Sequence, residues 1–401
     1  MNILRVITSM DPAVGGPCQG IRNSIPEHDK LGHKTEVVSL DDPDSAFLGK
    51  DGFRIIPLGP SNNPWSRSAA LIPWLIENLA KYDVVIVHGL WLFNSYAVNQ
   101  AVKKLLAKNP NASLPKIAVM PHGMLDPFFK KAKGRKLKAI RNWFYWKLLE
   151  SKVVNEADAL LFTCEAELEL ARIPFKPYRP KKEINVSYGV PKPPSLSDTA
   201  ANAFLEKYPA LKNQTYLLFL SRINYKKGVD LLIKGYEQIL KESVGRVPKL
   251  VIAGPGLDSP YGLEIKKLVE GNEALEKNIL FPGMLQGDLK WGAFYGAEAF
   301  ILPSHQENFG IAVVEALATG TPVLISNQVN IWHEIVQGNG GMVEDDTLEG
   351  VTKLLKNWTS LSETDVARMK SNALNVYNTN FAIEPAAKKL SDELIKLVQT
   401  H

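Results

Sequence analysis

Cysteine is scarce in this sequence, with only Cys18 and Cys164 among 401 residues. Two cysteines do not build the disulfide framework of a small secreted protein, so we expect a reducing, cytoplasmic environment. No run of about 18 uninterrupted apolar residues is present, which argues against a membrane-spanning helix. Residues 1–8 contain a short apolar run that is typical of a first strand and too short for a signal peptide.

An excess of charge of one sign is also missing, because 47 Lys and Arg stand against 42 Asp and Glu, a net charge of +5. This balance mildly favours anionic partners but is too weak to predict nucleic-acid binding. The hydrophobic fraction of 45% and charged fraction of 22% are those of a globular protein. They exclude a disordered or coiled-coil chain.

Several motifs of well-known chemistry are absent. The sequence has no GxxxxGK[ST] phosphate loop, no Cys or His pairs at zinc spacing, and no GxSxG elbow. Asp42-Pro43-Asp44 offers two carboxylates to a divalent ion, but its place in a Pro-containing loop favours a surface turn. We therefore identify no metal site in the sequence.

Short apolar runs alternate with longer mixed segments along the whole chain. They are rich in Val, Ile, Leu or Phe without strict alternation, as in strands of a parallel sheet that is buried on both faces. The segments between them show helical periodicity, so an α/β fold is predicted. The predicted strands are 3–8, 36–40, 84–88, 117–120, 159–163, 216–221, 250–253, 279–281, 299–302 and 322–325.

The alternation is interrupted once, at residues 172–200, which hold six prolines and suit a stiff linker. We predict an N-terminal domain over 1–190 and a C-terminal domain over 191–381. An amphipathic helix near 382–401 can pack back on the first domain. Ligands of open parallel sheets bind at the carboxyl ends of the strands, so two such domains joined by a hinge predict a cleft.

Two segments after predicted strands carry charged side chains. At 221–228, Arg222 and Lys227 flank a tight loop before a helix, which suits a diphosphate, although a solvated basic loop is the alternative. At 305–315, Glu307 precedes a helix and Glu315 lies within it. A carboxylate accepts two hydrogen bonds from a vicinal diol, although a solvated helix residue is the alternative for Glu315.

Glycines and histidines follow other predicted strands. The pair Gly15-Gly16 after the first strand and Gly254 after 250–253 permit close backbone approach to a ligand, a weak signal on its own. His88 and His122 end two strands of one sheet. A single histidine is more often structural, but two at one sheet edge favour ligand contact, chiefly for His122.

These motifs together resemble those of family-4 retaining glycosyltransferases of the GT-B fold, in which two Rossmann-like parallel-sheet domains face a cleft. The resemblance covers nearly the whole chain. The motifs that carry it are Ser-Arg-Ile-x3-Lys-Gly at 221–228, Gly-Pro-Gly at 254–256, Phe-Pro-Gly at 281–283, Glu307-x7-Glu315, and the stretch Pro-His-Gly-Met-Leu-Asp-Pro at 121–127. The last is common in members that build exopolysaccharide or lipopolysaccharide.

The resemblance implies a role for each matching residue. Arg222 and Lys227 would bind the donor diphosphate, Glu307 and His122 would contact the transferred sugar, and Glu315 would hold the ribose. No metal or cofactor is implied, because Arg and Lys supply the positive charge. One departure is Tyr188, where the family often has Asn. The implied donor-binding set is Gly15, Gly16, Gly254, Gly283, Met284, Leu285, Asn308, Phe309, Gly310, Ile311 and Glu315.

The implied activity is retaining transfer of a hexose, with glucose the first choice, from a UDP-sugar. The acceptor would be a polysaccharide or a lipid-linked saccharide in exopolysaccharide biosynthesis. A sucrose- or trehalose-type synthase with a soluble acceptor is one alternative, and a non-catalytic sugar-nucleotide-binding regulator is another. Release of UDP with and without acceptor distinguishes these possibilities.

Residues 127–149 contain no Asp or Glu but many basic and aromatic residues. We predict that Leu137, Ile140, Phe144 and Leu148 form an apolar stripe that packs on the first domain. The basic residues of 128–147 then remain exposed and suit an anionic membrane surface, at the inner face of the cell membrane. A solvated basic face, or a patch for an anionic soluble acceptor, is the alternative. The basic residues are Lys130, Lys131, Lys133, Arg135, Lys136, Lys138, Arg141 and Lys147.

Overall fold

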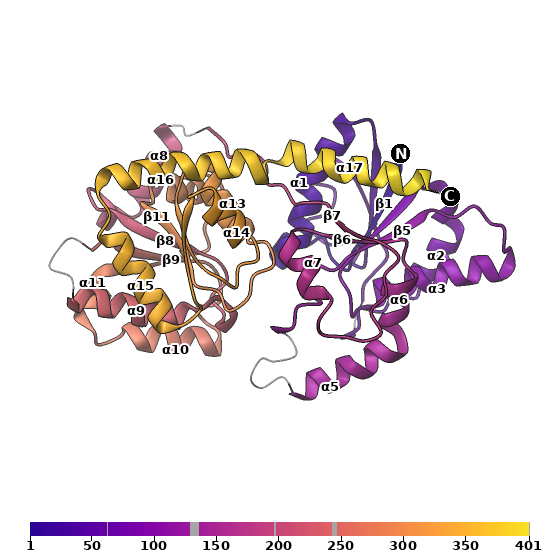
Figure 1. Ribbon diagram of the computed structural model, residues 1–401, viewed down its shortest axis with the longest axis horizontal. Helices are drawn as coiled ribbons and strands as arrows, with labels where there is room; N and C mark the ends of the chain where they lie inside the picture. The colour runs from indigo at the N-terminus through magenta and orange to yellow at the C-terminus, as the bar shows by residue number, and fades with distance from the viewer. Residues whose placement is uncertain (62, 129–135, 196–197, 243–246, 401) are drawn as a thin grey trace. The chain divides into compact units, whose positions relative to one another are not determined.

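The computed structural model describes residues 1–61, 63–128, 136–195, 198–242 and 247–400. The chain forms two units (Figure 1). Unit 1 comprises Met1–Pro191 together with Ile383–His401, and unit 2 comprises Lys192–Ala382. Each unit contains one parallel sheet, and the carboxyl ends of neighbouring strands therefore meet at one edge within each unit.

The sheet of unit 1 has the strand order β3-β2-β1-β4-β5-β6-β7, and all the pairings are parallel. Because β1 lies inside the sheet, the order reverses direction between β1 and β4, the place where open parallel sheets bind ligands. The strands are β1 (Asn2–Val6), β2 (Lys34–Ser39), β3 (Arg54–Pro57), β4 (Val84–His88), β5 (Lys116–Met120), β6 (Ala159–Phe162) and β7 (Glu183–Asn185).

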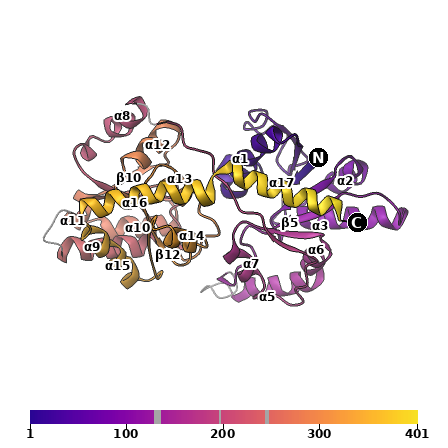
Figure 2. The same cartoon turned by 45° about the horizontal axis from the view of Figure 1, so that its top comes forward.

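Helices cover both faces of this sheet. Alternate strand residues point to opposite faces: Val85 joins a cluster with residues of α2, α3, α6 and α7, whereas Val84 joins one with Leu390 and Leu394 of α17. Helix α17 lies beside α1 (Figures 1 and 2). The helices are α1 (Gly16–Lys30), α2 (Leu71–Asn78), α3 (Phe93–Lys108), α5 (Lys136–Tyr145), α6 (Ser151–Glu156), α7 (Glu165–Ala171) and α17 (Ile383–Gln399).

The sheet of unit 2 has the order β10-β9-β8-β11-β12-β13, again with parallel pairings. Its strands are β8 (Tyr216–Leu220), β9 (Lys249–Ala253), β10 (Ile279–Gly283), β11 (Ala299–Leu302), β12 (Val323–Ser326) and β13 (Gly341–Glu344). Its helices are α8 (Asp198–Lys207), α9 (Val229–Glu242), α10 (Pro260–Val269), α11 (Glu273–Asn278), α12 (Gly287–Gly296), α13 (Ile311–Ala318), α14 (Trp332–Gln337), α15 (Leu348–Thr359) and α16 (Glu363–Val376).

The predicted α/β class is confirmed, and each predicted strand overlaps an observed one. Three further strands, β3, β7 and β13, were not predicted from the sequence. Each lies at an edge of its sheet, and their residues are half-buried or exposed. An edge strand needs no continuous apolar run, so the signal that identifies the central strands is missing there.

The proline-rich segment differs from the predicted linker. Strand β7 lies inside it, and the chain passes from unit 1 to unit 2 after Pro191. Residues before β7 pack on unit 1: Phe175 is buried and stacks on Trp146 with ring centroids 4.9 Å apart. The Tyr178 hydroxyl donates to Glu183 at 2.7 Å. The prolines therefore stiffen an ordered connection, and most of the segment belongs to unit 1.

The predicted inward stripe of 137–148 is wrong for the three residues whose side chains the structure describes. Ile140, Phe144 and Leu148 are 56%, 56% and 65% exposed. Tyr145 and Trp146 face the unit instead, where the Trp65 indole donates to the Tyr145 hydroxyl. Because 143–146 is an unbroken aromatic run, apolar residues lie on several sides of the helix and periodicity cannot choose the buried one.

Among the described residues, no helix combines the length and the apolar character needed to cross a bilayer. Residues 129–135, which include Lys130, Lys131, Lys133 and Arg135, lie outside the described part of the chain. The surface patch at this place is therefore defined below from α5 and the π-helical turn η3 (Trp146–Glu150) that follows it.

Candidate active site

Four neighbouring strands of unit 2 end where the predicted residues lie. Arg222 follows β8, Gly254 follows β9, Gly283 ends β10, and Glu307 follows β11. Strands β10, β9, β8 and β11 are consecutive in the sheet and parallel, so these loops share one edge. The structure thus brings the predicted donor-binding residues of unit 2 together.

Close backbone packing joins the first three of these loops. The Gly254 amide donates to the Gly283 carbonyl at 2.8 Å, and the Ile223 amide donates to the Pro255 carbonyl at 2.8 Å. Gly254 has φ of 142°, and an added Cβ would lie 1.9 Å from the Ser221 carbonyl oxygen. Any other residue there would push the Arg222 loop away from its neighbour, which explains the glycine.

Lys227 and Glu307 form a partly buried ion pair at this edge. Lys227 is 8% exposed, lies in the turn η5 (Tyr225–Lys227), and its ammonium contacts Glu307 Oε2. Burial alone would raise the pKa of Glu307, but Lys227 and Lys226 lower it below its ordinary value. The carboxylate is therefore ionised, and the pair places one positive and one negative charge beside the strand ends.

The backbone around both residues is fixed by neighbouring loops. The His305 amide donates to the Lys226 carbonyl at 2.8 Å, which ties the Lys227 turn to the Glu307 loop. The Glu307 amide donates to Gln328, and its carbonyl accepts from Asn330. Such anchoring holds the two charges in place before any ligand arrives.

A second pair lies nearby on α13. Glu315 is 9% exposed and accepts from the Lys290 ammonium of α12 at 2.6 Å. Burial raises the pKa of Glu315, and Lys290 counteracts this. Lys290 was not predicted from the sequence, because a lysine in the second turn of a surface helix resembles an ordinary solvated residue. Its position one turn beyond Met284 and Leu285 was the available signal.

The other predicted residues of unit 2 divide by exposure. Arg222 is exposed, and no hydrogen bond or ion pair of its side chain occurs among the described residues. Met284 is 58% exposed, whereas Leu285 and Phe309 are buried. The Phe309 ring packs edge-on against Phe381, so only its backbone can meet a ligand. The other predicted residues here are Asn308, which accepts from Asn330, Gly310, the N-cap of α13, and Ile311, its first residue.

Unit 1 contributes a separate set of predicted residues. Gly15 is the N-cap of α1 and Gly16 is its first residue, so amide groups at this helix end are free to bind an anion. The Tyr188 hydroxyl lies 3.4 Å from the Gly16 carbonyl oxygen, as a donor to it. The same Tyr188 ring meets His122 edge-on, with centroids 6.2 Å apart. Tyr188 therefore connects the glycine turn with His122.

His122 follows β5 in a strained loop with φ of 53°. Its Nε2 lies 2.9 Å from Nδ1 of His88. The loop is held by Glu167, whose Oε1 accepts from the Gly123 amide at 2.6 Å and whose Oε2 accepts from Thr163. Burial lowers the pKa of His122 to about 3 and that of His88 well below its ordinary value, so both rings are neutral near pH 7.

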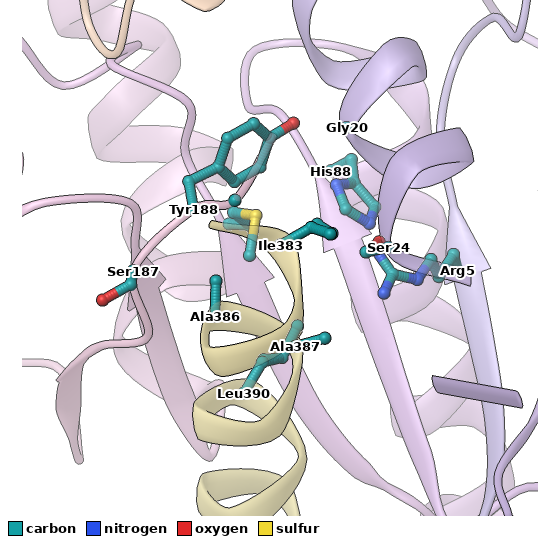
Figure 3. Close-up of a pocket in the computed structure, with 12 residues that line it drawn as sticks. Arg5, Gly20, Ser24, His88, Ser187, Tyr188, Ile383, Ala386, Ala387 and Leu390 are labelled. Carbon is teal, nitrogen blue, oxygen red and sulfur yellow. The ribbon is translucent and has the colours of Figure 1, made fainter. Parts of the chain in front are cut away.

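Two residues of this region, Glu167 and Arg5, were not predicted from the sequence. Glu167 stands in a helix rich in glutamate, and Arg5 stands in an otherwise apolar strand. Figure 3 shows Arg5 near His88 in a pocket of unit 1. A charged residue in a central strand is itself the signal that sequence reading can use, because strands buried on both faces rarely hold one.

Across the described ranges, no group of three or more His, Cys, Asp or Glu side chains is placed to hold a metal ion. Asp42 and Asp44 form an exposed turn in which the Asp44 amide donates to Asp42 at 3.0 Å.

Comparison with known proteins identifies the family. The model described as "Glycosyl transferase 4-like domain" matches residues 15–182, and that described as "Glycosyl transferases group 1" matches residues 202–376. An uncharacterized glycosyltransferase of Methanocaldococcus jannaschii is 30% identical over 154 residues, 36% of this chain and 37% of that protein. The alpha-monoglucosyldiacylglycerol synthase of Streptococcus pneumoniae is 35% identical over 108 residues, 27% of this chain and 23% of the synthase.

These alignments span well under half the length of either curated relative. A solved structure gives a wider match in fold. The Anabaena protein HepE, in complex with UDP-glucose, aligns with a TM-score of 0.74 at 16% identity, over 99% of this chain and 100% of that chain. The two family models cover most of both units, and each unit contains one parallel sheet, as the GT-B fold requires. This chain therefore belongs to the family-4 glycosyltransferases of the GT-B fold.

Proposed function

We propose that this glycosyltransferase moves a hexose, with glucose the first candidate, from a UDP-sugar to a saccharide or lipid-linked saccharide acceptor. We propose further that the anomeric configuration is retained and that no metal takes part. The observation that carries the proposal is the set of two partly buried lysine–glutamate contacts, Lys227–Glu307 and Lys290–Glu315, in the unit that also holds the exposed Arg222. The cations suit the diphosphate of a nucleotide sugar, and the carboxylates suit the hydroxyls of its ribose and its transferred sugar.

The diphosphate of a UDP-sugar already carries two negative charges, and breaking the bond between sugar and phosphate adds a third on the departing oxygen. Arg222 and Lys227 would neutralise this charge as it develops, which is the largest stabilisation that a protein offers in such a reaction. Lys227 contacts Glu307 in the structure. Binding of the diphosphate would draw the ammonium toward the phosphates and free Glu307 to accept hydrogen bonds from sugar hydroxyls.

Glu315 would accept from the two ribose hydroxyls, because an ionised carboxylate offers two oxygens at the spacing of a vicinal diol. Burial raises the pKa of Glu315, and Lys290, 2.6 Å from one of its oxygens, opposes that rise and favours the ionised form. In unit 1, the amide of Gly16 would bind phosphate at the start of α1, and neutral His122 would contact a sugar hydroxyl. Backbone groups at Gly283 and Met284 would meet the base.

Two of the similar proteins support the donor and the acceptor class. HepE was solved with UDP-glucose, and the Streptococcus relative is named for a glucosylated diacylglycerol. A sucrose- or trehalose-type synthase remains the second candidate within the enzyme class. A non-catalytic regulator is disfavoured, because a binding module needs neither a cation pair at the leaving group nor a preorganised carboxylate.

The test measures nucleotide release from a panel of UDP-, GDP- and ADP-sugars in the presence of EDTA, with and without a lipid-extract acceptor. We expect acceptor-dependent release of UDP from UDP-glucose and an α-configured product by proton NMR. Release that depends on a soluble sugar phosphate would instead support the second candidate. Activity that disappears in EDTA and returns with Mg²⁺ would contradict the metal-free step.

We also propose that the exposed face of α5 and η3 contacts an anionic membrane. This α5 face consists of Ile140, Trp143, Phe144 and Leu148, which are between 42% and 65% exposed. The neighbouring Arg141 and Lys147 are exposed too, and the Lys147 ammonium lies 4.1 Å from the Trp143 ring centroid. Aromatic and aliphatic side chains bordered by cations suit the headgroup region of acidic lipids.

Flotation with phosphatidylglycerol vesicles at low salt tests this contact. The double variant Ile140→Asn with Phe144→Asn should lose most of the bound fraction, since it removes apolar area without changing the net charge. Leu374→Asn, a change at an exposed leucine of unit 2, is the matched control and should bind as wild type does. Equal binding of all three proteins, or none to any vesicle, would rule the α5 face out as a membrane contact.

A further inference from the structure

A small pocket lies inside unit 1, and His88 is among the residues that line it (Figure 3). Its cavity volume is about 20 Å³, enough for one group slightly larger than a water molecule. Strand β1 provides Arg5, helix α1 provides Ser24, and β4 provides His88, while α17 closes the opposite side with Ala386 and Ala387. None of the described residues that line this pocket carries a carboxylate.

Arg5 is the charged group of this pocket. It is 2% exposed, and its Nε and Nη2 are buried without a hydrogen-bond partner. Burial lowers the pKa of Arg5 to about 10, so the guanidinium is still charged near pH 7. An unpaired buried charge is very unfavourable, and buried arginines are normally paired. Arg22 of the same unit follows that rule, with Asp51 at 2.7 Å.

His88 provides a second unsatisfied group. Its Nε2 is buried without a partner, while its Nδ1 lies 2.9 Å from Nε2 of His122. A hydrogen bond between two neutral imidazoles needs one N–H and one lone pair. If His122 is the donor, His88 carries its own proton on Nε2, where it lines the pocket together with the Arg5 donors. Three donor nitrogens without a partner then belong to two residues that line one cavity.

We propose that this pocket binds a single small monovalent anion of halide size, with chloride as the physiological candidate. The anion accepts hydrogen bonds from Arg5 Nε and Nη2 and from His88 Nε2, and it neutralises the guanidinium. The small cavity excludes phosphate and diphosphate groups, so the site differs from the donor site proposed above and does not depend on it. A water molecule fits the space but leaves the charge of Arg5 uncompensated.

The anion has a consequence for His122. By accepting from His88 Nε2, it fixes the His88 tautomer with a lone pair on Nδ1. His122 must then donate from Nε2 and keep its own lone pair on Nδ1. The ring of His122 is thereby locked as a hydrogen-bond acceptor on its other side. The pocket also lies under α17, so an ion there links β1, α1 and the C-terminal helix.

Crystals of the full chain soaked in sodium bromide give the direct test. We expect one anomalous peak within hydrogen-bond distance of Arg5 and His88. A second measurement follows the melting temperature of unit 1 as chloride replaces gluconate at constant ionic strength. A chloride concentration tenfold above Kd should raise it by roughly 3–5 °C. Arg5→Met, which removes the charge but keeps most of the volume, should abolish this rise.

The exposed Arg179→Met is the matched control for a general salt effect, and it should keep the wild-type response to chloride. An identical chloride response in Arg5→Met overturns the proposal. So does electron density for a water molecule, without a bromide peak, in wild-type crystals. The diffraction experiment uses the wild-type chain, so it decides the question even where Arg5→Met does not fold.

Discussion

The charged groups of the two units are balanced in different ways. In unit 2, the buried Lys227 and the half-buried Lys290 each contact a glutamate. In unit 1, Arg5 and His88 lie in a pocket without any acidic side chain among its described lining residues. The first arrangement compensates positive charge internally, whereas the second leaves the histidines neutral and the arginine without a partner.

This difference indicates which kind of ligand each unit suits. In the proposed donor site, a phosphate oxygen would take the place of the glutamate that pairs with the lysine, and this exchange of one anion for another would keep the lysine paired throughout. Unit 2 is therefore suited to a ligand that comes and goes. A buried guanidinium without a carboxylate has no such internal replacement, which favours a resident ion in unit 1.

The largest expected effect comes from breaking the Lys227–Glu307 pair of unit 2. Lys227→Ala should lower turnover with UDP-glucose by about 100-fold, because one charged donor to the leaving diphosphate is lost. Measured kcat, with thermal melting alongside, checks this. Glu307 is left unpaired in this variant, so some loss of stability is also expected.

The double variant Lys227→Met with Glu307→Gln removes both charges and should regain stability without regaining turnover. Lys234→Ala breaks the exposed pair with Asp230, 3.6 Å apart, and should leave turnover unchanged. Wild-type turnover in Lys227→Ala would remove Lys227 from the diphosphate site.

The next largest effect should be a difference in acid stability between the two units. His28 is fully buried in unit 1, and burial lowers its pKa to about 3. The folded pKa lies below the unfolded value of 6.5, so unfolding takes up a proton and stability falls as the pH drops through 6.5. At pH 5 this residue alone should cost about 2 kcal/mol. Glu307 in unit 2 has a lowered pKa, so its contribution fails only at more acidic pH.

Hydrogen exchange of each unit at pH 7 and pH 5 measures this difference. Unit 1 should lose protection first, and His28→Gln should reduce its loss. His333→Gln, at an exposed histidine of unit 2, should change nothing. Equal losses of protection in both units would show that the buried histidines do not control acid stability.

The sequence predicted the central strands and missed three edge strands for one physical reason. Strands such as β4 are buried along their whole length and must be apolar, while β3, β7 and β13 retain exposed or half-buried residues. The surface of 137–148 was assigned to the wrong side because an aromatic run fits several helix faces. Which aromatic is buried depends on partners such as Trp65 and Phe175, which are distant in sequence.

The residues of the candidate site also divide into those that a local motif predicts and those that it does not. Arg222, Lys227, Glu307 and Glu315 were predicted because each stands in a motif directly after a strand. Lys290 acts through a contact 25 residues away, and its only local signal is its position one turn beyond Met284 and Leu285. Arg5 was overlooked inside an apolar run, although its charge there was the unusual feature. Residues defined by a tertiary partner are thus the part that a single sequence does not reveal.

The smallest expected effect separates the two glutamates of unit 2. Glu315→Gln should weaken binding of UDP by about tenfold, since a neutral amide offers only one acceptor to the ribose diol. Glu307→Gln should weaken UDP-glucose more than UDP, because its proposed partner is the sugar. Titration calorimetry with both ligands checks this, and equal losses of UDP affinity in both variants would contradict the assignment.

Lys290→Met tests the role of Glu315 further. Without the nearby ammonium the pKa of Glu315 rises further, so UDP should bind more weakly at pH 6 than at pH 8 in this variant, and the difference should vanish when Glu315→Gln is added.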